Sequence, residues 1–356
     1  MKKIIFLLPL AAMLSCSGEI DTDNYQPKMP YTLSVDKAEI ESDGKQVATF
    51  CITDADGKVL TDNEELLSKI YFKDEATGKR LTRRTKTFRS VEDGEYTFSA
   101  TVSGDACANT VTVASSGRSK YEVFRKNVAL YRFTATWCQN CPSMTQGLER
   151  VSEWTKGRMV ELGLHGAGST YALSDGNKYV ADYLIQQFKA PGFPSCVYDL
   201  DLMSDARAYS DIEEIIFNRI AESPATCGIK ASSSLTADKL TISACVKTSS
   251  GGKYDIGFAI LRDNCIPGAD AYEKEYDNVV ISLTGNYENM STSSFELQKD
   301  QESALVQQDV TFAVASDAKS SDYSLVVFAL KQVGNEVNID NIVRIPLNGS
   351  VDYAYN

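Results

Sequence analysis

The chain has 356 residues, of which 43% are hydrophobic and 24% are charged, and its formal net charge is −12. This length suits two or three domains, and this composition is ordinary for a folded protein in water. The negative charge excludes nucleic acids as expected partners, because binding a phosphate backbone requires a surplus of basic side chains.

Residues 1–15 have the pattern of a lipoprotein signal peptide. Lys2 and Lys3 precede an apolar stretch, from residue 4 to 13, that is too short to span a bilayer. The pair Ser15-Cys16 resembles a bacterial lipobox, which implies that Cys16 becomes the lipidated first residue. The polar, acidic residues 16–29 are expected to form a tether, and they resemble the export signals of some Gram-negative surface lipoproteins. The expected location is therefore the outer membrane, on the periplasmic face or the cell surface, with attachment through the lipid on Cys16.

Residues 30–115 have the alternating pattern of short β-strands. Ala48, Phe50 and Ile52 share one face of a strand, and an Asp-Gly turn follows. This segment resembles bacterial immunoglobulin-like domains. It predicts a small N-terminal β-sandwich.

The cysteine count permits disulfides without assigning them. Export places the chain in an oxidising compartment, and eight cysteines remain besides Cys16. Cys51 and Cys107 could bridge two strands, although Cys51 falls on the polar face of its strand. The pairing of the cysteines outside the 138–141 motif is left open: Cys51, Cys107, Cys196, Cys227, Cys245 and Cys265.

Beyond a predicted linker at 115–120, the pattern changes to alternating strands and helices. Apolar runs predict strands near 127–135, 158–164 and 195–200, and helical periodicity predicts helices from residue 144, over 177–190 and over 211–223. Residues 120–224 are therefore expected to form an α/β unit with helices on both faces of a sheet. From 226 to 356 the strand pattern returns and predicts a C-terminal β-sandwich.

The motif Trp137-Cys138-Gln139-Asn140-Cys141-Pro142 lies between a predicted buried strand and a predicted helix. Two intervening residues place both sulfurs close enough to bridge. A cysteine at a helix N-terminus is stabilised as the thiolate, which is the attacking species in disulfide exchange. Cys138 is therefore expected to be the exposed nucleophile and Cys141 the resolving thiol, with Trp137 shielding the pair.

This motif, in this position, resembles the thioredoxin superfamily. The segment Gly192-Phe193-Pro194 resembles the family's cis-proline element, so the resemblance implies that Pro194 faces the cysteines and orients a substrate. A lipoprotein with this motif and a following β-domain also resembles the outer-membrane proteins of the "28-kilodalton outer membrane protein" family. The resemblance to the thioredoxin superfamily covers about residues 120–224.

Two further residues are candidates for tuning the cysteines. Arg132 stands six residues before Cys138, where many thioredoxins carry a buried acid. A cation there is expected to favour the thiolates but cannot act as a base; alternatively, Arg132 extends to the surface and touches neither sulfur. His165, the only histidine, ends a predicted strand at the edge where ligands of parallel sheets bind.

The sequence leaves two functions open. The first is thiol–disulfide exchange with protein thiols or disulfides. The second is a non-catalytic lipoprotein that uses the same fold as a scaffold for a surface protein or glycan partner, with an inert disulfide. No cofactor is expected. No metal is expected either, because Cys138, Cys141 and His165 are one ligand short of a zinc site.

Overall fold

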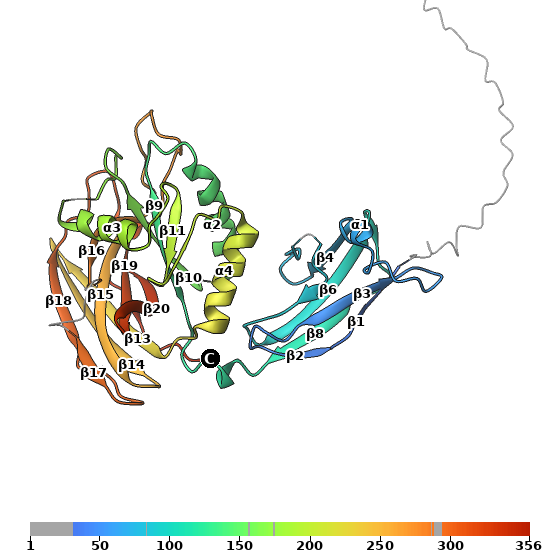
Figure 1. The fold of residues 1–356 in the computed structure, drawn as a ribbon. Coiled ribbons are helices and arrows are strands. Elements are labelled where there is room, and N and C mark those ends of the chain that lie inside the picture. The colour runs from blue at the N-terminus through green and yellow to red at the C-terminus, as the bar shows by residue number, and fades with distance from the viewer. Residues whose placement is uncertain (1–30, 83, 156, 174, 286, 288–293) are drawn as a thin grey trace, which may run out of the picture.

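The computed structural model describes residues 31–356 except 83, 156, 174, 286 and 288–293 (Figure 1). The predicted signal peptide, the tether and Cys16 lie outside the described residues. Figure 1 shows two lobes, a smaller one made by the N-terminal strands and a larger one made by the rest of the chain. We call residues 31–116 the N-terminal module, 120–224 the central unit and 226–356 the C-terminal module.

The N-terminal module consists of two facing sheets, with strand orders β1-β3-β5 and β2-β8-β6-β4, and β7 pairs with β6. Between the sheets, the centroid of the Phe50 ring lies 4.9 Å from that of Phe72 and 4.9 Å from that of Phe98. Ala48, Phe50 and Ile52 are fully buried, so the predicted alternation is confirmed. The elements are β1 (Thr32–Val35), β2 (Glu39–Glu41), β3 (Ala48–Thr53), α1 (Glu64–Leu67), β4 (Ile70–Asp74), β5 (Thr87–Phe88), β6 (Gly94–Val102), β7 (Asp105–Ala106) and β8 (Val111–Ser116).

The central unit alternates strands and helices as the sequence predicts. Strand β9 pairs in parallel with β10 on one side and antiparallel with β11 on the other. Apolar side chains of α2 and α4 cover one face of these strands, and those of α3 cover the other. The elements are β9 (Val128–Thr134), α2 (Cys141–Thr155), β10 (Met159–His165), α3 (Asp175–Gln187), β11 (Ser195–Tyr198), β12 (Leu202–Ser204) and α4 (Tyr209–Glu222).

The C-terminal module packs two sheets around an apolar core. One sheet has the order β18-β14-β13-β21, and the other contains β16, β15, β19 and β20, with β17 pairing β15. The elements are β13 (Cys227–Thr236), β14 (Lys239–Thr248), β15 (Gly252–Arg262), β16 (Val279–Thr284), β17 (Phe295–Leu297), β18 (Val306–Thr311), β19 (Tyr323–Val333), β20 (Glu336–Pro346) and β21 (Ser350–Val351).

The central unit and the C-terminal module share one nine-stranded sheet, in which eight strands have the order β12-β11-β9-β10-β16-β15-β19-β20 and the ninth, β17, pairs with β15. The junction is a parallel pairing in which Gly163 faces Val279, and the Gly163 amide donates to the Asn278 carbonyl (2.8 Å). A Cβ at Gly163 would lie 3.0 Å from that carbonyl oxygen, so the close approach favours glycine. The change of sequence pattern near residue 225 is therefore not a break in the sheet.

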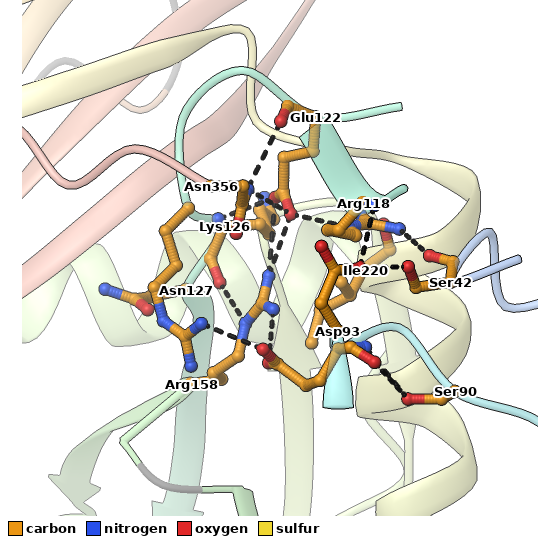
Figure 2. Close-up of polar contacts among 12 residues, drawn as sticks. Ser42, Ser90, Asp93, Arg118, Glu122, Lys126, Asn127, Arg158, Ile220 and Asn356 are labelled. Carbon is orange, nitrogen blue, oxygen red and sulfur yellow. Dashed lines mark hydrogen bonds and ion pairs between the residues drawn. The ribbon is translucent and has the colours of Figure 1, made fainter. Parts of the chain in front are cut away.

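The predicted linker at 115–120 is structured and partly buried, although Ser116, Ser119 and Lys120 are exposed. Strand β8 runs to Ser116, and Arg118 is only 2% exposed. The Arg118 guanidinium donates to Glu122 Oε2 (2.9 Å), to the Ser42 carbonyl (3.2 Å) and to the Ile220 carbonyl (2.8 Å) (Figure 2). The polar composition of this segment predicted a solvated linker, but the buried Arg118 guanidinium is neutralised by the Glu122 carboxylate.

A buried ionic network, shown in Figure 2, therefore joins the modules around Glu122. The Glu122 carboxylate is fully buried. It accepts hydrogen bonds from Arg118, from Arg158 (3.0 Å) and from the side chain of Asn356 (2.9 Å). Arg158 also forms an ion pair with Glu92 of the N-terminal module (2.5 Å). One carboxylate thus connects the N-terminal module, the central unit and the end of the chain.

Candidate functional site

Cys138 and Cys141 form a disulfide with Cα atoms 5.4 Å apart. Helix α2 begins at Cys141, so Cys138 lies in the preceding turn and not at the helix N-terminus as predicted. Within that turn the Cys141 amide donates to the Cys138 carbonyl (3.3 Å). Cys138 is 5% exposed and Cys141 is fully buried, so the prediction of an exposed Cys138 is wrong for the oxidised pair. It is Cys141 whose sulfur is placed to benefit from the helix dipole.

An aromatic stack forms one wall of the disulfide. Phe193 packs against the buried cluster of Ala135, Cys138 and Cys141, and its ring stacks on Trp137 (centroids 5.6 Å apart, planes at 10°) and on Phe133 (6.4 Å, 15°). Trp137 Nε1 donates to the Ala167 carbonyl (2.9 Å), which holds the indole although it remains 49% exposed. The half-exposed indole gives the site an apolar outer surface beside the sulfurs.

The loop after β10 is shaped to receive this stack. A Cβ at Gly166 would lie 2.4 Å from the Phe193 ring, so only glycine leaves room for it. The peptide bond between Phe193 and Pro194 is cis, and Pro194 is buried at the start of β11. The Gly192-Phe193-Pro194 segment therefore reaches the cysteines through Phe193.

The C-terminal module also contributes to this site, which the sequence did not predict. The Tyr272 amide donates to the Thr136 carbonyl (3.1 Å), two residues before Cys138. Thr145, one helical turn after Cys141, donates to Glu273 Oε1 (3.1 Å). The segment between β15 and β16 thus packs against both sides of the motif. No local signal marks these residues, because their role arises from the pairing of β16 with β10.

Arg132 lies beneath the first turn of α2 and is 2% exposed, so the alternative in which it extends to the surface is wrong. Its Nε lies 2.7 Å from Glu161 Oε1 on β10, and its Nη1 donates to Thr145 Oγ1. The two charges are an ion pair without linear hydrogen-bond geometry. Burial raises the pKa of Glu161 and the Arg132 charge opposes that rise. The cation expected near the cysteines is therefore largely neutralised by a carboxylate.

Glu161 was missed as a site residue, although the sequence carries a signal for it. Strands β9 and β10 are buried along their whole length, and Arg132 and Glu161 are the charged residues within their apolar runs. Opposite charges in two neighbouring buried strands indicate an internal ion pair. Glu273 is a second carboxyl nearby whose pKa is raised by burial. Glu161 and Glu273 are therefore two carboxyl groups beside Arg132 and Thr145 that the sequence analysis did not name.

His165 ends β10 as predicted, but its contacts are not with the disulfide. Its Nδ1 lies 3.0 Å from Ser169 Oγ, and its ring meets Tyr171 and Tyr276 edge-on at 5.8 and 5.2 Å. Burial, with a smaller contribution from the Arg132 charge, lowers its pKa to about 3. The imidazole is therefore neutral at physiological pH and stabilises the loop that carries Ser169.

The other cysteines of the described residues are free thiols. The possible Cys51–Cys107 bridge is absent because Cys107 points into the core of its module, whereas Cys51 alternates out of it. Cys196 is fully buried, and its Sγ lies 3.4 Å from Met144 Sδ. Burial raises the pKa of the Cys196 thiol, which makes this sulfur unreactive.

The described residues contain neither a clustered set of metal-binding side chains nor a helix that could span a membrane. No three His, Cys, Asp or Glu side chains there are grouped to hold a metal ion. No helix in the described part of the chain is long and apolar enough to cross a membrane.

Comparison with known proteins gives only distant similarity. No protein-family model matches the chain, and no curated protein matches it. Among solved structures, HBP35 of Porphyromonas gingivalis is 17% identical with a TM-score of 0.49, over 64% of this chain and 76% of that one. A domain of the outer membrane lipoprotein Omp28 from Porphyromonas gingivalis is 17% identical with a TM-score of 0.23, over 35% of this chain and 89% of that one. A protein of Agrobacterium tumefaciens is 15% identical with a TM-score of 0.44, over 62% and 94%. The function therefore rests on the chemistry of the site itself.

Proposed function

We propose that this protein is a thioredoxin-like thiol–disulfide exchange protein, exported and held at the outer membrane through a lipid on Cys16. The observation that carries the proposal is the Cys138–Cys141 disulfide, formed where a buried strand turns into α2, beside a half-exposed indole. A protein thiol or disulfide is the proposed substrate, and no cofactor is needed because the two sulfurs carry both electrons.

In the oxidising direction, a substrate thiolate attacks Cys138 Sγ and breaks its bond to Cys141. Cys141 leaves as a thiolate, which the N-terminus of α2 stabilises. A second substrate thiolate then attacks the substrate sulfur of the mixed disulfide, and Cys138 leaves as a thiolate. The substrate loses two electrons and gains a disulfide, and the protein is reduced. The same steps in reverse reduce a substrate disulfide.

The proposed roles of the neighbouring residues follow from their contacts. Phe193 packs against the cluster that contains both cysteines, and Pro194, which follows it through a cis peptide bond, would orient a substrate backbone. Trp137 offers an apolar surface to an approaching polypeptide. Arg132 would act on the thiols only as part of its pair with Glu161.

The experiment is a disulfide-reductase assay on the mature chain with insulin and dithiothreitol. Cys138→Ser is expected to abolish the catalysed rate, whereas the matched control Cys196→Ser, which removes a buried thiol outside the pair, is expected to retain it. The proposal fails if the wild-type protein does not exceed the rate with dithiothreitol alone, or if Cys138→Ser is as active as the control.

A second function, a binding lipoprotein with an inert disulfide, is favoured by one specific observation. Cys138 is only 5% exposed, whereas attack by a substrate requires access to its sulfur. The reduction potential separates the two functions, because structural disulfides lie below about −300 mV and exchange-active pairs lie above it. Equilibration with glutathione or dithiothreitol buffers, read by thiol alkylation, gives this potential.

A further inference from the structure

A cavity of about 640 Å³ lies between the central unit and the C-terminal module. Helix α2 and strand β10 form one wall, and the segment between β15 and β16, together with Arg344 of β20, forms the other. Its volume is within the range of small-molecule sites, which run from about 300 to 1,000 Å³. Because Thr145 lines it, the cavity begins one helical turn beyond Cys141.

The lining is strongly acidic. It contains two arginines, and each has an acidic partner: Arg132 pairs with Glu161, and Arg344 pairs with Asp263. Four further carboxylates line the cavity, and within the described residues none of them forms a salt bridge: Glu149, Glu273, Glu275 and Asp277. The lining therefore carries six carboxyl groups and two guanidinium groups, and the Arg132 charge also acts on Glu273.

One buried polar group of the lining lacks a hydrogen-bond partner. The Tyr276 side chain is 2% exposed, and its hydroxyl makes no hydrogen bond. Glu161 is also buried, but its Oε1 already lies 2.7 Å from Arg132 Nε. Buried polar atoms without partners are rare in folded proteins, and each one needs an explanation. A ligand with several hydrogen-bond donors would satisfy the Tyr276 hydroxyl.

We propose that this cavity binds an organic cation through its ammonium or guanidinium group. The carboxylates supply the counter-charge, and a guanidinium offers five N–H donors to carboxylate and hydroxyl oxygens. A metal ion fits less well, because no three acidic side chains of the described residues are close enough to chelate one. The ligand is a free amine or a lysine or arginine side chain of a polypeptide. This inference does not depend on the redox function.

Isothermal titration calorimetry at low ionic strength tests the proposal on the mature full-length protein. The probe is L-arginine amide, and saturable binding at one site per chain is expected. The variant Glu149→Gln/Glu273→Gln removes two of the four unbalanced charges, and it is expected to bind at least about tenfold more weakly, or 1.4 kcal/mol. The control Glu296→Gln/Glu336→Gln, which removes two exposed charges elsewhere, is expected to bind like the wild type.

Circular dichroism and thermal unfolding establish that each variant is folded. A capped Gly-Arg-Gly peptide distinguishes the two sources: tighter binding than arginine amide identifies a polypeptide side chain, and equal or weaker binding identifies a free amine. The proposal is overturned if the wild type gives no saturable heat with arginine amide, or if the two double variants bind arginine amide with equal affinity. It is also overturned if the protein binds calcium ions but not arginine amide.

Discussion

Lowering the pH below 6.5 is expected to destabilise the protein through its one histidine. His165 has a folded-state pKa of about 3, because its ring is buried and the Arg132 charge opposes protonation. In the unfolded chain the same imidazole has its ordinary pKa of about 6.5. Below pH 6.5 the unfolded state therefore binds a proton that the folded state does not, and folding stability falls with pH.

The magnitude follows from the two pKa values. Because the two pKa values differ by more than three units, lowering the pH from 7 to 4.5 removes about 3 kcal/mol of unfolding free energy. The ring is 2% exposed, so solvent screening does not reduce this value. The tyrosines that face the imidazole, Tyr171 and Tyr276, have raised pKa values and do not titrate in this range.

The assay is urea unfolding at pH 7 and pH 4.5, comparing the wild type with His165→Asn. Both tryptophans, Trp137 and Trp154, belong to the central unit, so fluorescence reports on the unit that contains His165. The substitution has its own cost in packing, but that cost is the same at both pH values and cancels. Carboxylates titrate equally in both proteins. If the wild type and the variant lose the same free energy between the two pH values, the burial argument for His165 is wrong.

Three other substitutions test the architecture and the site. Glu122→Gln leaves buried guanidinium groups without their carboxylate and is expected to lower the unfolding free energy by about 3–5 kcal/mol. The control Glu41→Gln removes a half-exposed carboxylate and should change the unfolding free energy by less than about 1 kcal/mol. Equal effects of the two substitutions in urea unfolding would contradict the network in Figure 2. Gly166→Ala places a Cβ 2.4 Å from a phenylalanine ring and should cost about 1–3 kcal/mol, whereas Gly268→Ala, which meets nothing within 4 Å, should be close to neutral in thermal unfolding. Arg132→Ala leaves a buried carboxylate unpaired and is expected to raise the thiol pKa values of the reduced cysteine pair, and unchanged alkylation rates across pH would exclude this influence.

Local patterns predicted the helices and strands of the central unit except β12, and they predicted the position of the cysteine pair between a strand and a helix. The alternation of β3 and the helical spacing of Met144, Leu148 and Val151 each report which side chains face a core, and those side chains are buried. The Trp-Cys-x-x-Cys motif indicated a strand-to-helix turn because proline tolerates the first turn of a helix. These features depend on residues close together in sequence.

Apart from the start of α2 and the burial of Cys138, the features that sequence patterns missed depend on long-range contacts. The contact of Tyr272 with the motif and the cavity beside Thr145 arise because β16 pairs with β10. Gly163, which lies at that pairing, does not indicate by itself which strand it will meet. The burial of Arg118 depends on Glu122, which is near in sequence, but also on the Ile220 carbonyl far along the chain. Polar segments are solvated by default, and only the folded structure shows which ones are enclosed.

The shared sheet also constrains the order in which the polypeptide acquires its structure. Gly163 meets Val279, its partner across the junction, only after 116 further residues (279 − 163) have emerged. Until then the outer edge of β10 presents unpaired amides and carbonyls, which other chains can join. Contacts of such sequence separation slow folding, and an exposed strand edge favours aggregation while they are missing. A fragment that ends before β16 is therefore expected to self-associate, even though it contains the complete cysteine motif.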